Sequence, residues 1–328
     1  MTSRERVYRA VEFNNPPRIP LSSPLLESSD MVRVFAGGAE DFTPSVPGES
    51  EWGWVMEKRS DLTSCGYPTV HPLKDWDNYS SYSFPDPCAR GRFDGLRKRF
   101  RDKDPLLNEK FIYAGIGVGP LTLCSFLLGF ENFLFTLAAN PERIRELVDR
   151  YHDYLSAMVK QAAEFSEIDA VLVYDDSAMQ TGPFFSMDMW RDLFKPSLKG
   201  LCELTHSYGK KFFLHCCGNL CDHAPEFAVC GVDILDNKQP LLWLDQAEKL
   251  KGQITFHTCL DFTTFRELPQ AEIKPRIREL IRRTSLPQGG FIGTMNNTID
   301  PDVPAEKVEA VWNAYRKIQL ETAHACTA

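Results

Sequence analysis

The sequence predicts an α/β fold, a (β/α)8 TIM-type barrel with an N-terminal helical and loop extension, and three observations support this prediction. Short apolar runs alternate with helical periodicity along the second half of the chain, as in parallel strands joined by crossover helices. Eight strand candidates occur in the 328 residues, and eight strands make a closed barrel of this kind. The glycine-rich phosphate loops that usually mark the alternative, an open doubly wound sheet, are missing from the sequence. Because no internal repeat or low-complexity linker divides the chain, residues 1–328 are expected to form one domain.

The first third of the chain contributes one helix and three strand candidates. Residues 3–13 are predicted to form an amphipathic helix, because Val7, Ala10 and Val11 recur at helical spacing before Pro16-Pro17. Strands are expected at residues 18–21, 52–55 and 111–115. The Ser-, Pro- and Gly-rich segment 22–50 and the Pro-containing segment 60–90 are expected to be loops. Long loops in compact domains are usually functional or disordered, so segment 22–50 is a candidate lid.

The remainder of the chain is predicted to alternate regularly between strands and helices. Five further strands are expected at residues 170–174, 212–214, 232–235, 254–257 and 291–294. Helices are expected at residues 120–139, 141–166, 187–207, 221–229, 241–250, 270–284 and 304–320. This alternation places the carboxyl ends of all the strands at one end of the barrel, where active sites of such barrels lie.

Composition and charge exclude several classes of protein. The net charge of −8 arises from 37 basic and 45 acidic side chains without a basic stripe, which argues against a nucleic-acid partner. No run of 18 apolar residues and no signal peptide are found, so neither a membrane partner nor secretion is expected. The ten cysteines show no spacing of a disulfide framework. A reducing, cytoplasmic location is therefore expected, where free thiolates can hold a metal.

The most informative stretch of the sequence is 211–219. A short apolar run there ends in His215, Cys216 and Cys217. His215 and Cys217 are two residues apart, so both side chains leave the same face of an extended chain. Imidazole and thiolate form a zinc-type ligand pair. Cys216 is expected to point to the opposite face and pack, and packing remains the alternative role for the other cysteine too.

Two further residues are candidates for the metal site. Cys259 is the preferred third ligand, because the end of its strand is expected near that of His215 in a barrel. His257 and Cys259 repeat the His-x-Cys spacing, although His257 could equally be a core histidine. Asp236 lies between the two pairs in the sequence and could supply an oxygen ligand.

Polar and aromatic residues near the predicted strand ends complete the expected site. Asp175 and Asp176 follow the strand at 170–174 and are candidates for general acid or base. Because adjacent carboxylates point apart on a strand, one is expected to face the site and the other to cap a turn. The residues expected to bind the substrate are Trp52, Tyr174, Gln180 and Asn296.

Several short motifs follow one another along the chain in a characteristic order. They are Ser3-Arg4-Glu5-Arg6-Val7, Pro17-Arg18-Ile19-Pro20, Trp52-Gly53, His71-Pro72-Leu73, Gly129-Phe130-Glu131-Asn132, Asp175-Asp176, His215-x-Cys217-Gly218-Asn219 and Gly289-Gly290-Phe291-Ile292. Together they resemble the uroporphyrinogen decarboxylase superfamily. The resemblance spans nearly the whole chain and implies a (β/α)8 barrel.

Within this superfamily, the chain resembles the cobamide-dependent methyltransferases more than the decarboxylases. The decarboxylases carry an arginine-rich segment near the N-terminus, whereas residues 21–27 here contain no arginine. The methyltransferases hold zinc with a His-x-Cys pair, matched by His215 and Cys217, and with a later cysteine. The last predicted strand has no cysteine where that ligand is expected, so the resemblance leaves Cys259 as its replacement.

The resemblance implies a zinc-dependent methyltransferase that moves a methyl group from a methoxylated substrate to the cob(I)amide of a separate corrinoid protein. Aromatic residues near the predicted barrel mouth favour an aryl methyl ether as the small-molecule methyl donor. Two alternatives remain: a second-step methyltransferase from methyl-corrinoid to a thiol or tetrahydrofolate, and a decarboxylase-like relative without metal.

Overall fold

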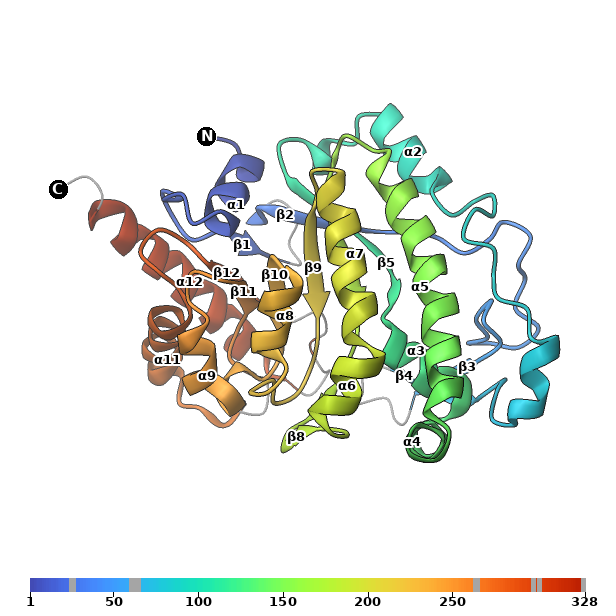
Figure 1. Ribbon diagram of the computed structural model, residues 1–328. Helices are drawn as coiled ribbons and strands as arrows, with labels where there is room; N and C mark the ends of the chain where they lie inside the picture. Colours follow the sequence, from blue (N-terminus) through green and yellow to red (C-terminus); the bar gives the residue numbers. More distant parts are fainter. Residues whose placement is uncertain (24–27, 59–65, 262–265, 296–298, 300–302, 326–328) are drawn as a thin grey trace.

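Figure 1 shows the computed structural model, in which eight parallel strands form a nearly closed barrel with helices around it. The structure describes residues 1–23, 28–58, 66–261, 266–295, 299 and 303–325. In their hydrogen-bonded order, the strands are β1 (Leu21–Ser22), β12 (Phe291–Thr294), β11 (Thr255–Thr258), β10 (Ile234–Asn237), β9 (Lys211–His215), β6 (Ile168–Tyr174), β5 (Phe111–Val118) and β2 (Met31–Phe35). This architecture confirms the predicted fold class.

Helices surround the barrel (Figure 1), and α1 packs on the amino end of its interior. They are α1 (Ser3–Val11), α2 (Asp94–Arg101), α3 (Pro120–Leu128), α4 (Phe130–Ala139), α5 (Pro141–Ala163), α6 (Met187–Leu193), α7 (Lys195–Ser207), α8 (Ala224–Cys230), α9 (Leu244–Lys249), α11 (Gln270–Thr284) and α12 (Ala305–Ala325). Short 3-10 helices span Trp76–Ser81, Pro105–Leu107 and Pro240–Trp243. The predicted helix at 120–139 is divided at Gly129 into α3 and α4, which meet at a bend of 108°. In the described part of the chain no single helix is long and apolar enough to cross a membrane, although this bent pair passes that test together.

The second barrel strand lies elsewhere than the sequence pattern predicted. The expected strand at 52–55 is wrong: β3 (Val55–Lys58) pairs antiparallel with β4 (Gly66–Val70), outside the barrel sheet. Trp52 and Trp54 precede β3 and pack on other aromatic rings instead of joining a strand. The barrel strand is β2, inside the segment predicted to be a loop. Arg33 interrupts the apolar run of this strand, so the sequence pattern did not predict it.

The barrel ladder has a gap between β1 and β2, which is closed by Asp30. The backbone N–H of Asp30 donates to the carbonyl of Leu21 over 2.7 Å. The buried Asp30 carboxylate accepts a hydrogen bond from the Leu21 N–H at 2.9 Å and pairs with Arg6 and Arg18. One carboxylate therefore joins the first two strands and the N-terminal segment.

The interior of the barrel is apolar at its amino end. Inward-facing side chains of the strands, including Phe111, Leu172 and Phe213, form one cluster with Val7 and Val11 of α1. Helix α1 is anchored there because the buried Asp169 carboxylate accepts hydrogen bonds from the Arg4 guanidinium at 2.7 Å and the Tyr8 hydroxyl at 2.9 Å. Polar inward-facing side chains, among them His215, Asp236 and His257, follow at the carboxyl ends of the strands.

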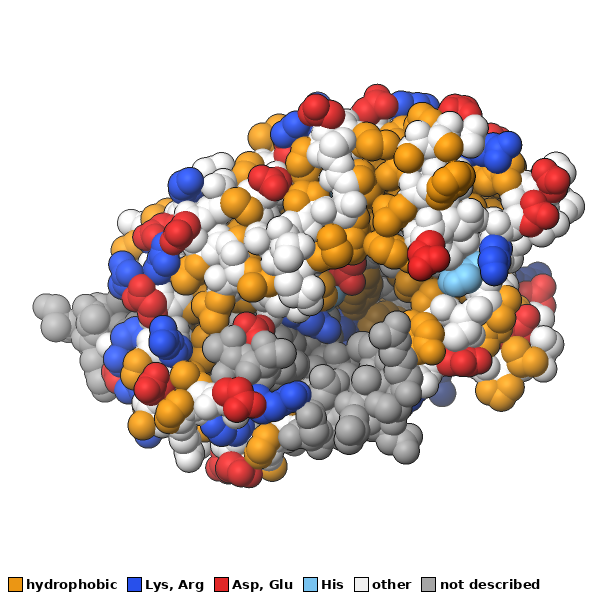
Figure 2. Space-filling view, turned by 90° about the horizontal axis from the view of Figure 1, so that it is seen from below, with side chains coloured by type: hydrophobic (Ala, Val, Ile, Leu, Met, Phe, Trp, Pro, Cys, Tyr) orange, Lys and Arg blue, Asp and Glu red, His pale blue; other side chains and the backbone are white. Residues whose placement is uncertain are grey.

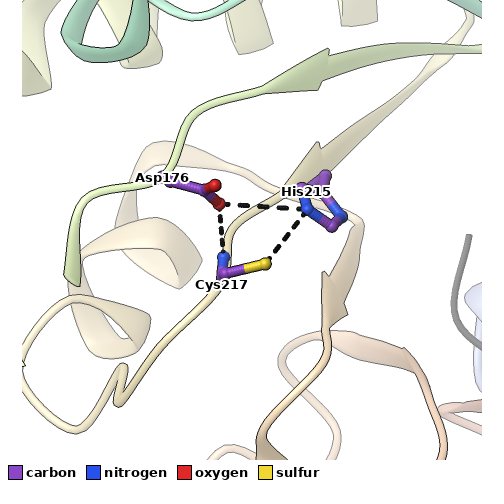
Figure 3. A group of neighbouring side chains, drawn as sticks. All are labelled: Asp176, His215 and Cys217. Carbon is purple, nitrogen blue, oxygen red and sulfur yellow. Dashed lines mark hydrogen bonds and ion pairs between the residues drawn. The ribbon is translucent and has the colours of Figure 1, made fainter. Parts of the chain in front are cut away.

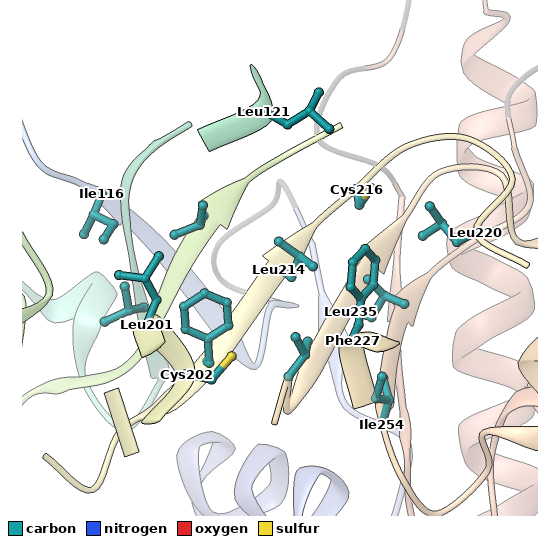
Figure 4. Close-up of a cluster of buried hydrophobic side chains, with 14 of the residues drawn as sticks. Ile116, Leu121, Leu201, Cys202, Leu214, Cys216, Leu220, Phe227, Leu235 and Ile254 are labelled. Carbon is teal, nitrogen blue, oxygen red and sulfur yellow. The ribbon is translucent and has the colours of Figure 1, made fainter. Parts of the chain in front are cut away.

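A second apolar layer lies between the strands and the surrounding helices, and Figure 4 shows part of it. Leu214 and Leu235 on the strands, Leu201 and Cys202 on α7, and Phe227 on α8 are all at most 2% exposed. Truncating such a side chain to alanine typically costs about 2–5 kcal/mol. This layer fixes the strands so that their carboxyl ends hold polar groups in defined positions.

Candidate metal centre at the barrel mouth

The carboxyl ends of the barrel strands meet at one end of the molecule. Figure 2 views the molecule from below, onto this end, and shows a hollow in which charged and hydrophobic side chains are visible. Binding sites of (β/α)8 barrels lie at this end because the loops that follow the strands converge there.

Three side chains from two neighbouring strands converge at this end (Figure 3). His215 is the last residue of β9, Cys217 follows in the next loop, and Asp176 follows β6. The Cys217 Sγ lies 3.3 Å from the His215 Nε2, and an Asp176 oxygen lies 3.9 Å from the same nitrogen. All three potential donor atoms lie within 4.8 Å of one another.

The donor set fits a divalent metal such as zinc. Tetrahedral zinc with typical nitrogen and sulfur bond lengths separates its donor atoms by about 3.6 Å. The nitrogen–sulfur separation of 3.3 Å is close to this value, and the nitrogen–oxygen separation is 3.9 Å. Nitrogen, sulfur and oxygen are all ordinary zinc donors, and three protein ligands leave a position for substrate in a catalytic site.

Asp236 lies behind His215 instead of joining the three donors. One of its oxygens is 2.5 Å from the His215 Nδ1, and the other is 3.0 Å from the His257 Nδ1. Burial by itself would raise the pKa of Asp236, but the two imidazoles hold it well below its usual range. A carboxylate on Nδ1 orients the ring and leaves Nε2 for a metal, an arrangement common to metal-binding histidines.

The imidazole and the thiol influence each other's ionisation. Burial would lower the pKa of His215, yet the charge of Asp236 and its hydrogen bond keep this pKa well above its ordinary value. Burial raises the pKa of the Cys217 thiol, and His215 opposes that increase. A bound cation would favour the thiolate, because metal-coordinated thiols are deprotonated.

The loop that carries Cys217 is held tightly. The Asn237 side-chain amide donates to the carbonyls of Cys216 and Gly218, at 2.8 and 3.1 Å. Gly218 has a φ of +90°, and a Cβ atom there would lie 2.3 Å from the carbonyl oxygen of Ala178 in the β7 (Ala178–Met179) turn. Glycine is therefore required for the loop to approach this neighbouring turn.

The two adjacent aspartates have different surroundings. Asp176 is exposed at the mouth, and its carboxylate accepts the Cys217 N–H at 2.7 Å. Asp175 turns away toward the start of α3, where its carboxylate accepts the Thr122 N–H at 2.8 Å. Burial raises the pKa of Asp175 to about 7, an effect that the hydrogen bonds from Thr122 and Leu121 partly offset. Only Asp176 is placed beside the imidazole and the thiol.

Other residues expected in the site lie apart from this group. Cys259 is buried in the layer between the strands and the helices, where its thiol interacts with Tyr315 of α12. It is not among the converging donors of the described residues. Gln180 is exposed in the turn after β7. Asn296 lies outside the described residues.

Trp52 and Tyr174 line a cavity of about 320 Å³ beside the mouth. Trp52 packs against Trp54, Tyr151 and Tyr154, with ring centroids 4.8–5.9 Å apart. The Tyr174 ring lies 5.3 Å from the His215 ring, measured between centroids. The cavity therefore adjoins the side chain that packs on the candidate metal ligand.

Sequence reasoning missed Arg33, which lies at the same end of the barrel. It is half-buried on β2, and an Nη donates to the Tyr174 hydroxyl over 3.3 Å. Its guanidinium lies over the Phe35 ring, 4.8 Å from the centroid. Its place could have been inferred from the sequence, because Met31, Arg33 and Phe35 are spaced two residues apart in an otherwise apolar run. Residues with this spacing lie on one face of a strand.

Comparison with known proteins adds a family and a related fold. The family described as uroporphyrinogen decarboxylase (URO-D) matches residues 61–318. The structure of a methyltransferase from Methanosarcina mazei is similar at a TM-score of 0.69 and 17% identity, covering 97% of this chain and 99% of that chain. Native xylanase 10B from Thermotoga maritima gives a TM-score of 0.45 and 10% identity, covering 98% of this chain and 100% of that chain. No curated protein sequence matches significantly.

Proposed function

Since this chain belongs to the uroporphyrinogen decarboxylase family, we propose that it is a zinc-dependent methyltransferase. Its methyl donor would be a methoxylated aromatic compound, and its acceptor the cob(I)amide of a separate corrinoid protein. The observation that carries this proposal is the convergence of Asp176, His215 and Cys217 at the barrel mouth. The fold shared with the Methanosarcina methyltransferase is consistent with it.

The residues at the mouth favour methyl transfer over decarboxylation of a polyanionic tetrapyrrole. A tetrapyrrole with many carboxylates requires several basic partners, and residues 21–27 supply no arginine. A His, Cys and Asp group instead supplies the nitrogen, sulfur and oxygen donors of a metal site. The aromatic cavity beside it can accept a flat ring.

In the proposed reaction, the methyl C–O bond breaks and its electron pair remains on the oxygen, which then takes up a proton. The methyl group forms its new bond with the electron pair of the corrinoid cobalt. Zinc, when bound, would supply Lewis acidity toward the oxygen that carries the methyl group. His215, Cys217 and Asp176 would hold the ion, and Asp236 would keep the His215 ring oriented. Asp175 would position the end of β6 through its bond to α3.

The proposal is tested by comparing two cysteines of one loop. Cys217 belongs to the donor group, whereas Cys221 is exposed four residues later and serves as the matched control. We expect stoichiometric zinc in the wild-type protein and in Cys221→Ser, and its loss in Cys217→Ser. Methyl transfer from methoxybenzoate to cob(I)alamin, followed by the change in corrinoid absorbance, should require Cys217 as well.

The same preparations distinguish the other candidate reactions. Absence of zinc from the wild-type protein, together with full activity of Cys217→Ser, would exclude the metal mechanism. Transfer from methylcobalamin to a thiol or to tetrahydrofolate, without transfer from any aryl ether, would instead assign the second step of such a pathway.

A further inference from the structure

We propose that Arg33 and Tyr174 form a carboxylate-binding subsite, and that the methyl donor is therefore an aromatic methyl ether bearing one carboxylate. This inference rests on the proposed function and specifies its substrate class. It begins from the juxtaposition of a guanidinium, an aromatic cavity and the candidate metal ligands at one end of the barrel.

The Arg33 guanidinium lacks an acidic partner within the described part of the chain. Its contacts there are the Tyr174 hydroxyl at 3.3 Å and the face of the Phe35 ring at 4.8 Å. Other arginines near the barrel are paired, as shown by Arg6 and Arg18 with Asp30 and by Arg92 with Glu51. A half-buried guanidinium loses part of its hydration, so an anion on its remaining N–H groups is favourable.

The two residues that Arg33 contacts also line the cavity. Phe35 and Tyr174 form part of the wall of the 320 Å³ space, together with Trp52, Trp54 and Tyr151. This volume lies at the lower end of the range for small-molecule sites, roughly 300–1,000 Å³. A ring in the cavity would therefore contact the two side chains that hold the guanidinium, with aromatic side chains at its faces or edges.

Phe35 contacts the Arg33 guanidinium and also lines the cavity, and Gly115 is its partner in the pairing of β2 with β5. A Cβ atom on Gly115 of β5 would lie 2.9 Å from the Phe35 ring, so any larger residue would displace that ring. The small residue in β5 thus leaves room for Phe35 to pack on the guanidinium. Tyr174 contacts the same guanidinium by accepting a hydrogen bond at its hydroxyl.

The same tyrosine connects this subsite to the metal centre. The Tyr174 ring lies 5.3 Å from the His215 ring, and His215 belongs to the donor group. A substrate whose carboxylate binds Arg33 would therefore extend along Tyr174 toward Cys217 and Asp176. A planar guanidinium matches one carboxylate with two parallel hydrogen bonds. This favours a methoxybenzoate over a neutral ether and over a polyanion.

The subsite can be tested by binding, without the corrinoid partner. Isothermal titration of the purified protein with 4-methoxybenzoate, benzoate and the neutral analogue benzamide measures the contribution of the carboxylate. We expect the carboxylates to bind at least about tenfold more tightly than benzamide, which corresponds to about 1.4 kcal/mol. Arg33→Gln should remove this preference and leave the binding of benzamide unchanged.

Arg97 is the matched control. Its guanidinium also lies over a phenylalanine ring, that of Phe165, but it is exposed and is not among the residues of the proposed subsite. Arg97→Gln should retain the preference for benzoate. Equal affinity of the wild-type protein for benzoate and benzamide, or no binding of either, would overturn the proposal, as would an unchanged preference in Arg33→Gln. Methoxyacetate binding as tightly as methoxybenzoate would overturn its aromatic part.

These outcomes are separate from failure of the proposed function. Preferential benzoate binding that depends on Arg33 would support the subsite even if no methyl transfer to cob(I)alamin occurred. Methyl transfer from methoxybenzene at the rate of methoxybenzoate would support the reaction and overturn the carboxylate subsite.

Discussion

Asp236 is the residue on which the geometry of the candidate centre depends most. Its two oxygens are each used by a different imidazole, those of His215 and His257. Histidine ligands whose second nitrogen donates to a carboxylate have a fixed tautomer and ring orientation. The His215 Nε2 is thereby left facing the Cys217 thiol and the Asp176 carboxylate.

Replacing this carboxylate should weaken metal binding without removing a ligand. We expect Asp236→Asn to lower zinc affinity by about 10- to 100-fold, because the amide cannot accept from both imidazoles. Competition titration against a chelator of known affinity measures this change. Asp188→Asn, at a side chain that is 92% exposed, is the control and should retain wild-type affinity. Unaltered affinity in Asp236→Asn would show that Asp236 does not orient the ligand.

Some residues of the candidate site could be predicted from the sequence for a clear physical reason. His215 and Cys217 could be paired because a strand alternates its side chains, and β9 extends to His215. The same rule did not place Cys259 at the mouth, because β11 ends at Thr258 and the alternation does not continue beyond it. Asp176 could be identified only as one of two adjacent candidates, since choosing between them required the position of α3.

At the scale of an element, the loop after β9 depends on Gly218. We expect Gly218→Ala to destabilise the fold by about 1–3 kcal/mol, because it combines a positive φ with a clash at the Ala178 carbonyl. It should also lower zinc affinity, since Cys217 is the preceding residue. Gly209→Ala separates the two causes, because Gly209 has a φ of +70° and open space around it. If both variants lose equal stability in urea titrations, the clash has no effect.

The start of α8 should make stability dependent on pH. His223 is 1% exposed, and its ring lies 5.2 Å from that of Trp190 and 5.8 Å from that of Phe227. Burial lowers its pKa to about 4, and the nearby Glu226 only partly opposes this decrease. The unfolded chain, with a pKa of about 6.5, therefore binds more protons between these two values.

The stabilisation by neutral His223 is complete above the pKa that this histidine has in the unfolded chain. It is lost as the pH falls toward the lower pKa that His223 has in the folded protein. Between pH 7.5 and pH 4.5, the wild-type protein should lose roughly 2–3 kcal/mol more unfolding free energy than His223→Phe. Urea denaturation at both pH values measures the difference. Parallel pH profiles for the two proteins would contradict this assignment.

The elements themselves were predictable where their hydrophobic pattern was uninterrupted. Strands β6 and β9 to β12 agree with the predicted positions, because each is a short apolar run between helices. Strand β2 was missed because Arg33 lies in the middle of it. Arg33 lies at the barrel mouth, where a charge is tolerated, and it bonds to Tyr174 there. The charged residue that interrupts the apolar pattern of β2 is therefore also a residue near the candidate site.

For the whole molecule, the contacts of Asp30 that close the barrel are important for stability. Its carboxylate pairs with Arg6 and Arg18 and accepts the Leu21 N–H, so it connects β2 to the N-terminal segment. Removing one partner of a buried ion pair typically costs 3–5 kcal/mol. We therefore expect Asp30→Ala to destabilise the protein by about 3–5 kcal/mol in urea denaturation.

The closure prediction has a control on the surface. Asp94→Ala removes a carboxylate that is 68% exposed and pairs only weakly with Arg97 over 3.9 Å. Its effect should remain below about 1 kcal/mol. Faster hydrogen exchange in β1 and β2 of Asp30→Ala, compared with β9, would localise the loss to the gap. An equal increase in hydrogen exchange over all strands would indicate that Asp30 stabilises the whole barrel and not the gap between β1 and β2 in particular.

The pairing of β1 with β12 also affects how the protein is made. Leu21 lies opposite Gly293 and Ser22 opposite Thr294, so the first strand bonds to one synthesised some 270 residues later. During translation, β1 can complete its pairing only after residues 291–294 have left the ribosome. Contacts of such long sequence separation slow folding. The nascent chain therefore carries an open sheet edge until the final strand emerges.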